Sequence, residues 1–69
     1  MADIEIIVNG STRQVPDGLT AEQLLERLSV KKELVVVELN LNILKRHQLA
    51  GAALKAGDRV EIVQLAGGG

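Results

Sequence analysis

Short blocks of alternating apolar and polar residues open this chain of 69 residues. The first block, residues 4–8, is rich in β-branched side chains and runs into Asn9-Gly10. Asn-Gly is the strongest short hairpin signal, because both central positions of a type I′ turn need a positive φ. Residues 11–15 are therefore predicted to form the returning strand, and the Pro-Asp-Gly turn at 16–18 ends it.

A helical period replaces the alternation from Thr20 onward. Thr20 and Gln23 have the spacing of a capping box, in which the hydroxyl accepts a backbone N–H and the glutamine reaches back. Leu24, Leu25 and Leu28 follow on one face, with charged residues on the other. This pattern predicts an amphipathic helix of about two turns that begins at Thr20 and ends within residues 29–33.

The second half of the chain predicts three more strands. Residues 34–39 are the most strand-like, residues 43–44 form a short strand after a turn at 40–42, and residues 59–65 form the last strand after a tight turn. Between them, residues 45–53 are expected to be a loop with a helical turn. An α+β fold accounts for this order: a mixed sheet of four to five strands with one main helix packed on one face. Its first and last strands lie parallel and adjacent, because a helix-containing connection permits parallel pairing. This is the β-grasp arrangement.

Composition restricts the chemistry that this small domain can perform. The chain has no cysteine, which excludes disulfides, cysteine zinc clusters and thiol nucleophiles. It has no aromatic residue, so the core must be aliphatic and bases cannot stack on it. A net charge of −1 gives no electrostatic footprint for nucleic acid. With no secretion signal and no apolar run long enough for a membrane span, we expect a cytoplasmic protein, monomeric alone, that binds neither nucleic acid nor membrane.

Three consecutive glycines, Gly67, Gly68 and Gly69, follow the last predicted strand. Glycine has no side chain, so such a segment adds nothing to a core and can pass through a channel too narrow for other residues. We expect a β-grasp domain at 1–66 and a flexible glycine tail at 67–69 that presents the carboxylate of Gly69. The simpler alternative is a linker or a disordered end without a role.

Several short strings carry a resemblance to a known family. They span nearly the whole chain in a fixed order: Val8-Asn9-Gly10, Pro16-Asp17-Gly18 with Thr20 and Leu24-Leu25, Val37-Glu38-Leu39-Asn40, Arg46, Gly57-Asp58-Arg59-Val60-Glu61-Ile62-Val63 and Gly68-Gly69. With these strings the chain resembles the ThiS-type sulfur carriers of thiamine biosynthesis, in the ubiquitin-like β-grasp superfamily. It differs from that pattern at Asn40-Leu41-Asn42, where the family tends to have an Asn-Gly turn.

The resemblance implies a carrier that catalyses nothing itself and binds no cofactor. A ThiF-like partner would use ATP to adenylate the carboxyl of Gly69, while Gly68 and Gly67 pass through narrow sites on the partners. A sulfur donor such as a cysteine desulfurase persulfide would then give a C-terminal thiocarboxylate. A ThiG-like thiazole synthase would take that sulfur for the thiazole ring of thiamine.

A docking surface for these partners is expected beside the tail. Strand alternation places Ile7, Val36, Val63 and Leu65 on the sheet face opposite the helix, and the resemblance adds Arg46. His47 is the only histidine, so it is expected to be a solvated loop residue and not a metal ligand.

Three alternatives stay open at this point. The sulfur could serve molybdopterin or another sulfur-incorporating pathway, although the residues before the glycines lack the proline and aromatic residues typical of the molybdopterin branch. The chain could be a ubiquitin-like modifier of lysines. It could also be a β-grasp binding module whose glycine tail has no role.

Overall fold

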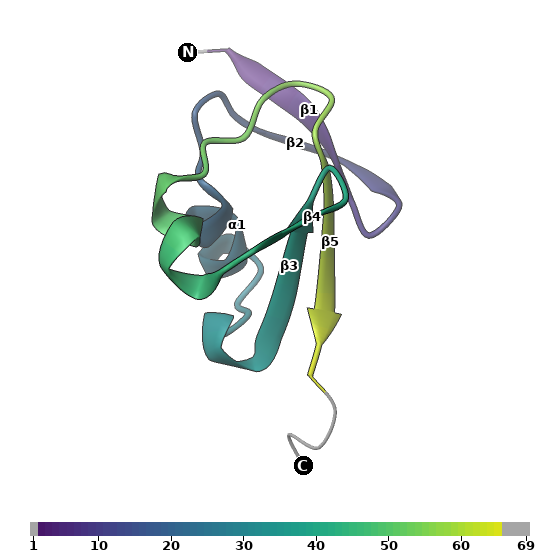
Figure 1. The fold of residues 1–69 in the computed structure, drawn as a ribbon. Helices are drawn as coiled ribbons and strands as arrows, with labels where there is room; N and C mark the ends of the chain where they lie inside the picture. The colour runs from purple at the N-terminus through teal and green to yellow at the C-terminus, as the bar shows by residue number, and fades with distance from the viewer. Residues whose placement is uncertain (1, 66–69) are drawn as a thin grey trace.

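The computed structural model describes residues 2–65, which form one mixed sheet and three short helices (Figure 1). The elements, in chain order, are β1 (Asp3–Val8), β2 (Ser11–Pro16), α1 (Ala21–Arg27), the 3-10 helix η1 (Lys32–Leu34), β3 (Val35–Leu39), β4 (Asn42–Leu44), the 3-10 helix η2 (Arg46–Gly51) and β5 (Arg59–Gln64). The predicted order of elements and the α+β class are confirmed.

The sheet has the order β2-β1-β5-β3-β4. β1 and β5 pair in parallel at its centre, as predicted, and the other neighbouring strands are antiparallel. Figure 1 shows α1 and the green turn of η2 on the same side of the sheet, and their buried leucines share one core with the strands. No helix of residues 2–65 covers the other side, which we call the open face.

The helix is shorter than its sequence pattern predicted. Thr20 has an extended backbone and serves as the N-cap: its hydroxyl accepts the Gln23 N–H at 3.1 Å, and the Gln23 side chain accepts the Thr20 N–H at 3.0 Å. The capping box is thus confirmed, but α1 begins one residue later than expected. It also ends before the expected 29–33, because Ser29 turns to φ +58° and Val30 N–H donates back to the Leu25 carbonyl.

Each strand also differs from its predicted range by one residue at one end. Leu34 belongs to η1, so β3 begins at Val35. The chain turns at Asn40 and Leu41, both at positive φ, and β4 therefore begins at Asn42.

The core is aliphatic throughout and lies between the sheet and the helices. Its buried members are Ile6, Val8, Val15, Leu19, Ala21, Leu24, Leu25, Val37, Leu49, Leu54 and Val60. The sequence pattern had not placed Leu19, Leu49 and Leu54 there, because they lie outside the regular periods. The Leu54 N–H donates to the Leu19 carbonyl at 2.8 Å, which ties the segment after η2 to the start of α1, and Leu49 is buried in η2, which packs against α1.

Candidate functional site

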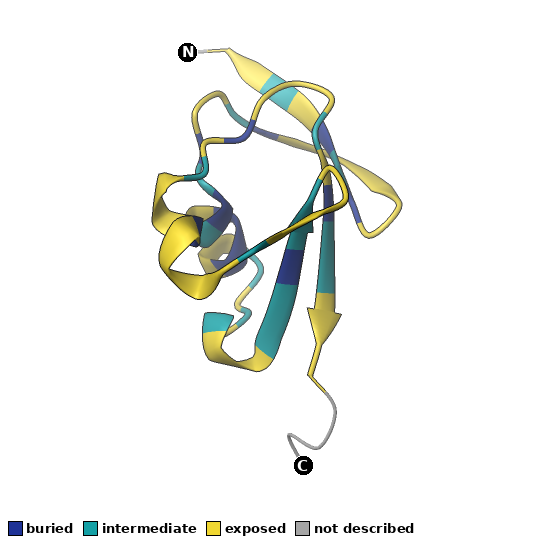
Figure 2. Cartoon of the chain, in the orientation of Figure 1, coloured by how far each residue is buried: buried dark blue, intermediate teal, exposed yellow. Residues whose placement is uncertain are grey.

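Three of the four aliphatic residues of the predicted docking surface lie on strands of the sheet, and Leu65 directly follows β5. Val36 on β3 lies directly opposite Val63 on β5, and Ile7 on β1 pairs with Arg59 at the start of β5. Val63 and Leu65 remain 52% and 45% exposed, whereas Ile7 and Val36 are half-buried by their neighbours. Figure 2 shows β5 changing from buried to exposed toward its C-terminal end. None of the four is among the residues packed against the core, which agrees with the predicted alternation.

Arg46 does not belong to this surface. It is the first residue of η2, which packs against α1 on the covered side of the sheet. Its guanidinium donates to the Glu33 carbonyl at 3.4 Å, so the side chain links η2 to η1. The structure thus separates Arg46 from the open face, and on that face it brings Val36, Val63 and Leu65 together but leaves Ile7 at the other end of β5, opposite Arg59.

The chain leaves the sheet at a defined point beside Leu34. Leu65 lies just past the end of β5, and its N–H donates to the Leu34 carbonyl at 2.9 Å, which extends the β3–β5 ladder by one bond. The predicted tail residues Gly67, Gly68 and Gly69 lie outside the described residues. What the structure gives is the position and direction of the segment that precedes them.

Asn9 holds the exposed half of β5 in place. Backbone pairing between β1 and β5 ends at Val8 and Val60. Beyond it, the Asn9 side chain takes the place of a peptide group: its Oδ1 accepts the Ile62 N–H at 2.7 Å and its Nδ2 donates to the Ile62 carbonyl at 3.3 Å. The sequence predicted Asn9 as a turn residue, and its φ of +48° agrees, but this second role was missed.

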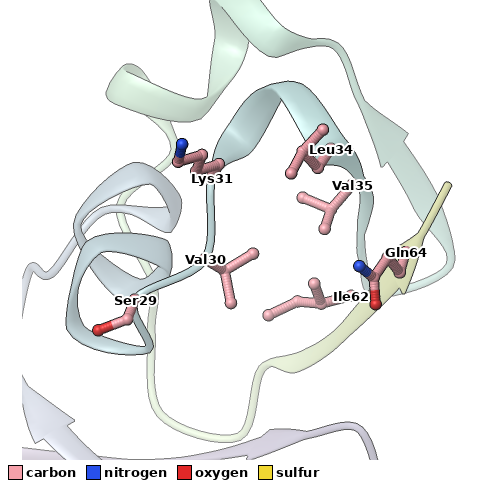
Figure 3. A pocket seen from close by; sticks show the side chains of 7 residues that line it. All are labelled: Ser29, Val30, Lys31, Leu34, Val35, Ile62 and Gln64. Carbon is pink, nitrogen blue, oxygen red and sulfur yellow. The ribbon is translucent and has the colours of Figure 1, made fainter. Parts of the chain in front are cut away.

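An apolar pocket of about 390 Å³ lies on the covered side, where β5 ends (Figure 3). Its lining residues are Ser29, Val30, Lys31, Leu34, Val35, Ile62 and Gln64. Figure 3 shows the aliphatic side chains of Val30, Leu34 and Ile62 converging on the hollow. The sequence pattern did not predict this pocket, because its lining comes from segments that only the packing brings together.

Charged groups are distributed unevenly around the sheet. On the open face, Glu38 and Glu61 lie directly opposite each other on β3 and β5, and both are half-buried. On the helical side, Lys32 forms an ion pair with Glu22. The hydrogen bond from Lys32 to Glu22, with the negative charge of Glu22, raises the pKa of the Lys32 ammonium above its usual value.

Residues 2–65 contain no group of three His, Cys, Asp or Glu side chains placed to hold a metal ion. His47 lies exposed in η2, as expected of a solvated residue. None of the helices in this part of the chain is long and apolar enough to cross a membrane. The described residues thus place exposed Val63 and Leu65 at the end of the sheet where the chain leaves it.

Comparisons with known proteins point in one direction. A model of the ThiS family matches residues 5–69. A thiazole synthase from Paramagnetospirillum magneticum is 38% identical over 66 residues, which are 96% of this chain and 20% of that protein. The chain therefore spans only a fifth of the length of this relative.

Solved structures agree with the family match. The crystal structure of the thiamine biosynthesis protein ThiS from Geobacter metallireducens superposes with a TM-score of 0.83 at 36% identity, covering 96% of this chain and 100% of that one. The solution NMR structure of a thiamine biosynthesis protein from the same organism gives a TM-score of 0.79 at 36% identity, with 96% and 88% covered.

Proposed function

Because this chain belongs to the ThiS family, we propose that it carries sulfur on the carboxyl group of Gly69 for the thiazole ring of thiamine. The family match, which extends to residue 69, is the observation that carries this proposal. The β-grasp fold shared with a ThiS protein over 96% of the chain supports it. The proposal takes Gly69 to be the final residue of the working carrier.

Activation of Gly69 must come from a partner. An ionised carboxylate is a poor electrophile, and a leaving group is needed before sulfur can be attached. In the proposed first step, the Gly69 carboxylate attacks the α-phosphorus of ATP on a ThiF-like enzyme, forming an acyl-adenylate and releasing pyrophosphate. The ATP is bound and used by that enzyme, and this chain acts as its protein substrate.

Sulfur is then attached to the acyl group in two steps. The terminal sulfur of a persulfide attacks the acyl carbon and displaces AMP, which leaves an acyl disulfide. A thiol attacks the other sulfur of that disulfide, so the thiocarboxylate leaves and a new disulfide forms. Since this chain has no cysteine, both the persulfide, for example from a cysteine desulfurase, and the thiol belong to partners.

Thiazole synthase is the proposed acceptor of the sulfur. A segment similar to this chain shares one polypeptide with the thiazole synthase of P. magneticum, which supports a functional connection between the two. A carrier for molybdopterin or another sulfur pathway would share the same activation steps. Transfer of labelled sulfur from the charged carrier to purified thiazole synthase, and not to a molybdopterin-forming enzyme, distinguishes the two.

Mass spectrometry of the intact protein tests the carrier chemistry. After incubation with the activating enzyme, ATP and a persulfide source, we expect a gain of about 16 Da, the replacement of one oxygen by sulfur. An unchanged mass would contradict the proposal. A series of heavier adducts on other proteins would instead support a lysine modifier, and full biological activity without Gly68 and Gly69 would support a binding module.

The glycines are proposed to pass through narrow sites on two partners, where a Cβ would clash. Gly68→Val should therefore block the mass gain while circular dichroism shows a folded domain. Gly51→Val is a matched control, since a Cβ at Gly51 meets no atom within 4 Å. A normal mass gain in the Gly68 variant would refute this role.

The open face beside the chain exit is the proposed docking surface. Exposed Val63 and Leu65, with half-buried Val36 directly opposite Val63, form an aliphatic area there, whereas Ile7 lies apart from it, opposite Arg59 at the start of β5. Replacing Val63 and Leu65 by serine removes apolar area without adding charge, and should weaken binding to the activating enzyme about tenfold. Leu41→Ser is the control, because Leu41 is 82% exposed but lies at the opposite end of β3 and β5. Equal affinities of the two variants would argue against this surface.

A further inference from the structure

Asn9 and Gly10, at the tip of the first hairpin, form a pair that can react without any partner. The carboxamide carbon of an asparagine can be attacked by the backbone nitrogen of the next residue, and a glycine leaves that nitrogen unshielded because it has no side chain. Both residues are exposed, and a Cβ built at Gly10 meets no atom within 4 Å. No backbone carbonyl of residues 2–65 accepts the Gly10 N–H. The attacking nitrogen therefore lies in an open turn.

The carboxamide of Asn9, in contrast, is held by the fold. Its Oδ1 accepts the Ile62 N–H at 2.7 Å, and its Nδ2 donates to the Ile62 carbonyl at 3.3 Å. Both polar atoms of the side chain are thus bound to β5. Attack by the Gly10 nitrogen makes Cγ tetrahedral and expels Nδ2, so these two bonds cannot persist during the reaction. The carboxamide has to leave Ile62 before it can react.

We infer that Asn9 is a site of deamidation and that its bonds to Ile62 control the rate. The Gly10 nitrogen, deprotonated by hydroxide, attacks Cγ of Asn9. The bond from Cγ to Nδ2 breaks, Nδ2 leaves as ammonia, and a five-membered succinimide forms. Water then opens the ring at either carbonyl and gives aspartate or isoaspartate. No atom is oxidised or reduced, and the reaction goes beyond the proposed sulfur carriage without depending on it.

The product cannot hold β5 as the asparagine does. A carboxylate only accepts hydrogen bonds, so it retains the bond from the Ile62 N–H but repels the Ile62 carbonyl oxygen. Isoaspartate also adds one methylene to the main chain of the two-residue turn between Val8 and Ser11. Backbone pairing of β1 with β5 ends at Val8 and Val60, so no ladder bond replaces the lost one. Loss of ammonia thus permanently loosens the half of β5 that leads to the chain exit.

Peptide mapping of the full chain provides the test and its control. Cleavage after lysine and arginine places Asn9 in the peptide 1–13, and it places Asn40 and Asn42 together in the peptide 33–45. Deamidation raises the mass of a peptide by about 1 Da, because an amide becomes a carboxylate. The control asparagines precede leucine and isoleucine, whose side chains shield the backbone nitrogen. The protein is incubated in mildly alkaline buffer, either folded or unfolded in urea, before cleavage.

Two rate comparisons are expected. In the unfolded protein, the peptide 1–13 should gain this mass well before the peptide 33–45, and similar rates would overturn the assignment of the site. In the folded protein, Asn9 should react about tenfold more slowly than in the unfolded one, the factor that two hydrogen bonds supply. Equal rates in the two states would overturn the control by Ile62.

Amide exchange identifies the opening that permits the reaction. At urea concentrations below the unfolding transition, the deamidation rate of Asn9 and the exchange rate of the Ile62 amide should rise by the same factor, because both require the same bond to break. Faster deamidation with unchanged exchange would show that Asn9 reacts while still bound, and would overturn the proposed control.

The variant Asn9→Asp supplies one of the two products in pure form. Its Ile62 amide should exchange about fivefold faster than that of the wild type, since one of the two hydrogen bonds is lost. The deamidated wild type, separated by its extra charge, should unfold at a lower urea midpoint than the unmodified protein. Unchanged exchange in the variant, together with an unchanged midpoint of the deamidated protein, would overturn the effect on β5.

Discussion

Removing the side chain of Asn9 should loosen the half of β5 that leads to the chain exit. Each of its two hydrogen bonds to Ile62 contributes about 1 kcal/mol to stability. Its φ of +48° adds a cost of about 1 kcal/mol for a residue such as alanine. Asn9→Ala should therefore lower the free energy of unfolding by about 3 kcal/mol, and Asn9→Gly, which accepts the positive φ, by about 2 kcal/mol.

Urea unfolding followed by far-ultraviolet circular dichroism measures these losses, since the chain has no aromatic residue to report by fluorescence. Gln14→Ala is the control: this exposed residue of β2 makes one 3.4 Å bond to Glu5, and its loss should cost less than about 0.5 kcal/mol. Amide exchange gives a local readout, because the Ile62 N–H donates to the Asn9 side chain. In Asn9→Gly, the exchange rate of the Ile62 amide should rise by a larger factor than the loss of global stability predicts.

A glycine variant as stable as the wild type would refute the stabilising role of the Asn9 side chain. Exchange of the Ile62 amide that follows global stability alone would also refute it, because the side chain would then stabilise the turn and not β5. Equal losses of stability in the alanine and glycine variants would still support the contribution of the hydrogen bonds, but they would refute the cost assigned to the positive φ.

Further predictions concern the ends of α1 and the ion pair beside it. Ser29→Gly should raise the free energy of unfolding by about 0.5–1 kcal/mol in urea, because Ser29 has a φ of +58°; a loss of stability would show that its side chain matters more than its backbone. Thr20→Ala should cost about 1 kcal/mol by removing the capping hydroxyl, and a smaller cost than for Gln14→Ala would contradict that role. Because the pKa of Lys32 is raised, its ion pair with Glu22 stabilises the folded protein by a constant amount near neutral pH, and this stabilisation is lost as the pH rises above 10.5. Lys32→Met should therefore reduce the fall of the unfolding free energy at alkaline pH. An unchanged fall would refute the contribution of the pair.

The amino-acid sequence determined the local structure of this protein well. Asn9-Gly10 specified the first hairpin, because few other residues accept two successive positive φ angles. Thr20 and Gln23 specified the start of α1 to within one residue, since the capping box depends on a fixed spacing of two side chains. Alternation in β3 and β5 also specified which side chains face the core, because a strand has a strict period of two.

Contacts between distant segments were decided only by the tertiary structure. Leu49 and Leu54 lie in segments without a regular period, and they are buried because the chain after η2 closes over α1. Arg46 has no local signal for the side of the sheet on which it lies, and the packing of η2 places it away from the open face.

The candidate site shows the same division between local and distant information. Its aliphatic residues follow from alternation within single strands, so the sequence was sufficient to find them. The pairing of Glu38 with Glu61 depends on the register between β3 and β5, which are separated by β4 and η2 along the chain. The bond from Asn9 to Ile62 likewise joins residues 53 positions apart. A pattern along one strand determines which face a side chain occupies, but register and packing between strands determine which side chains it meets there.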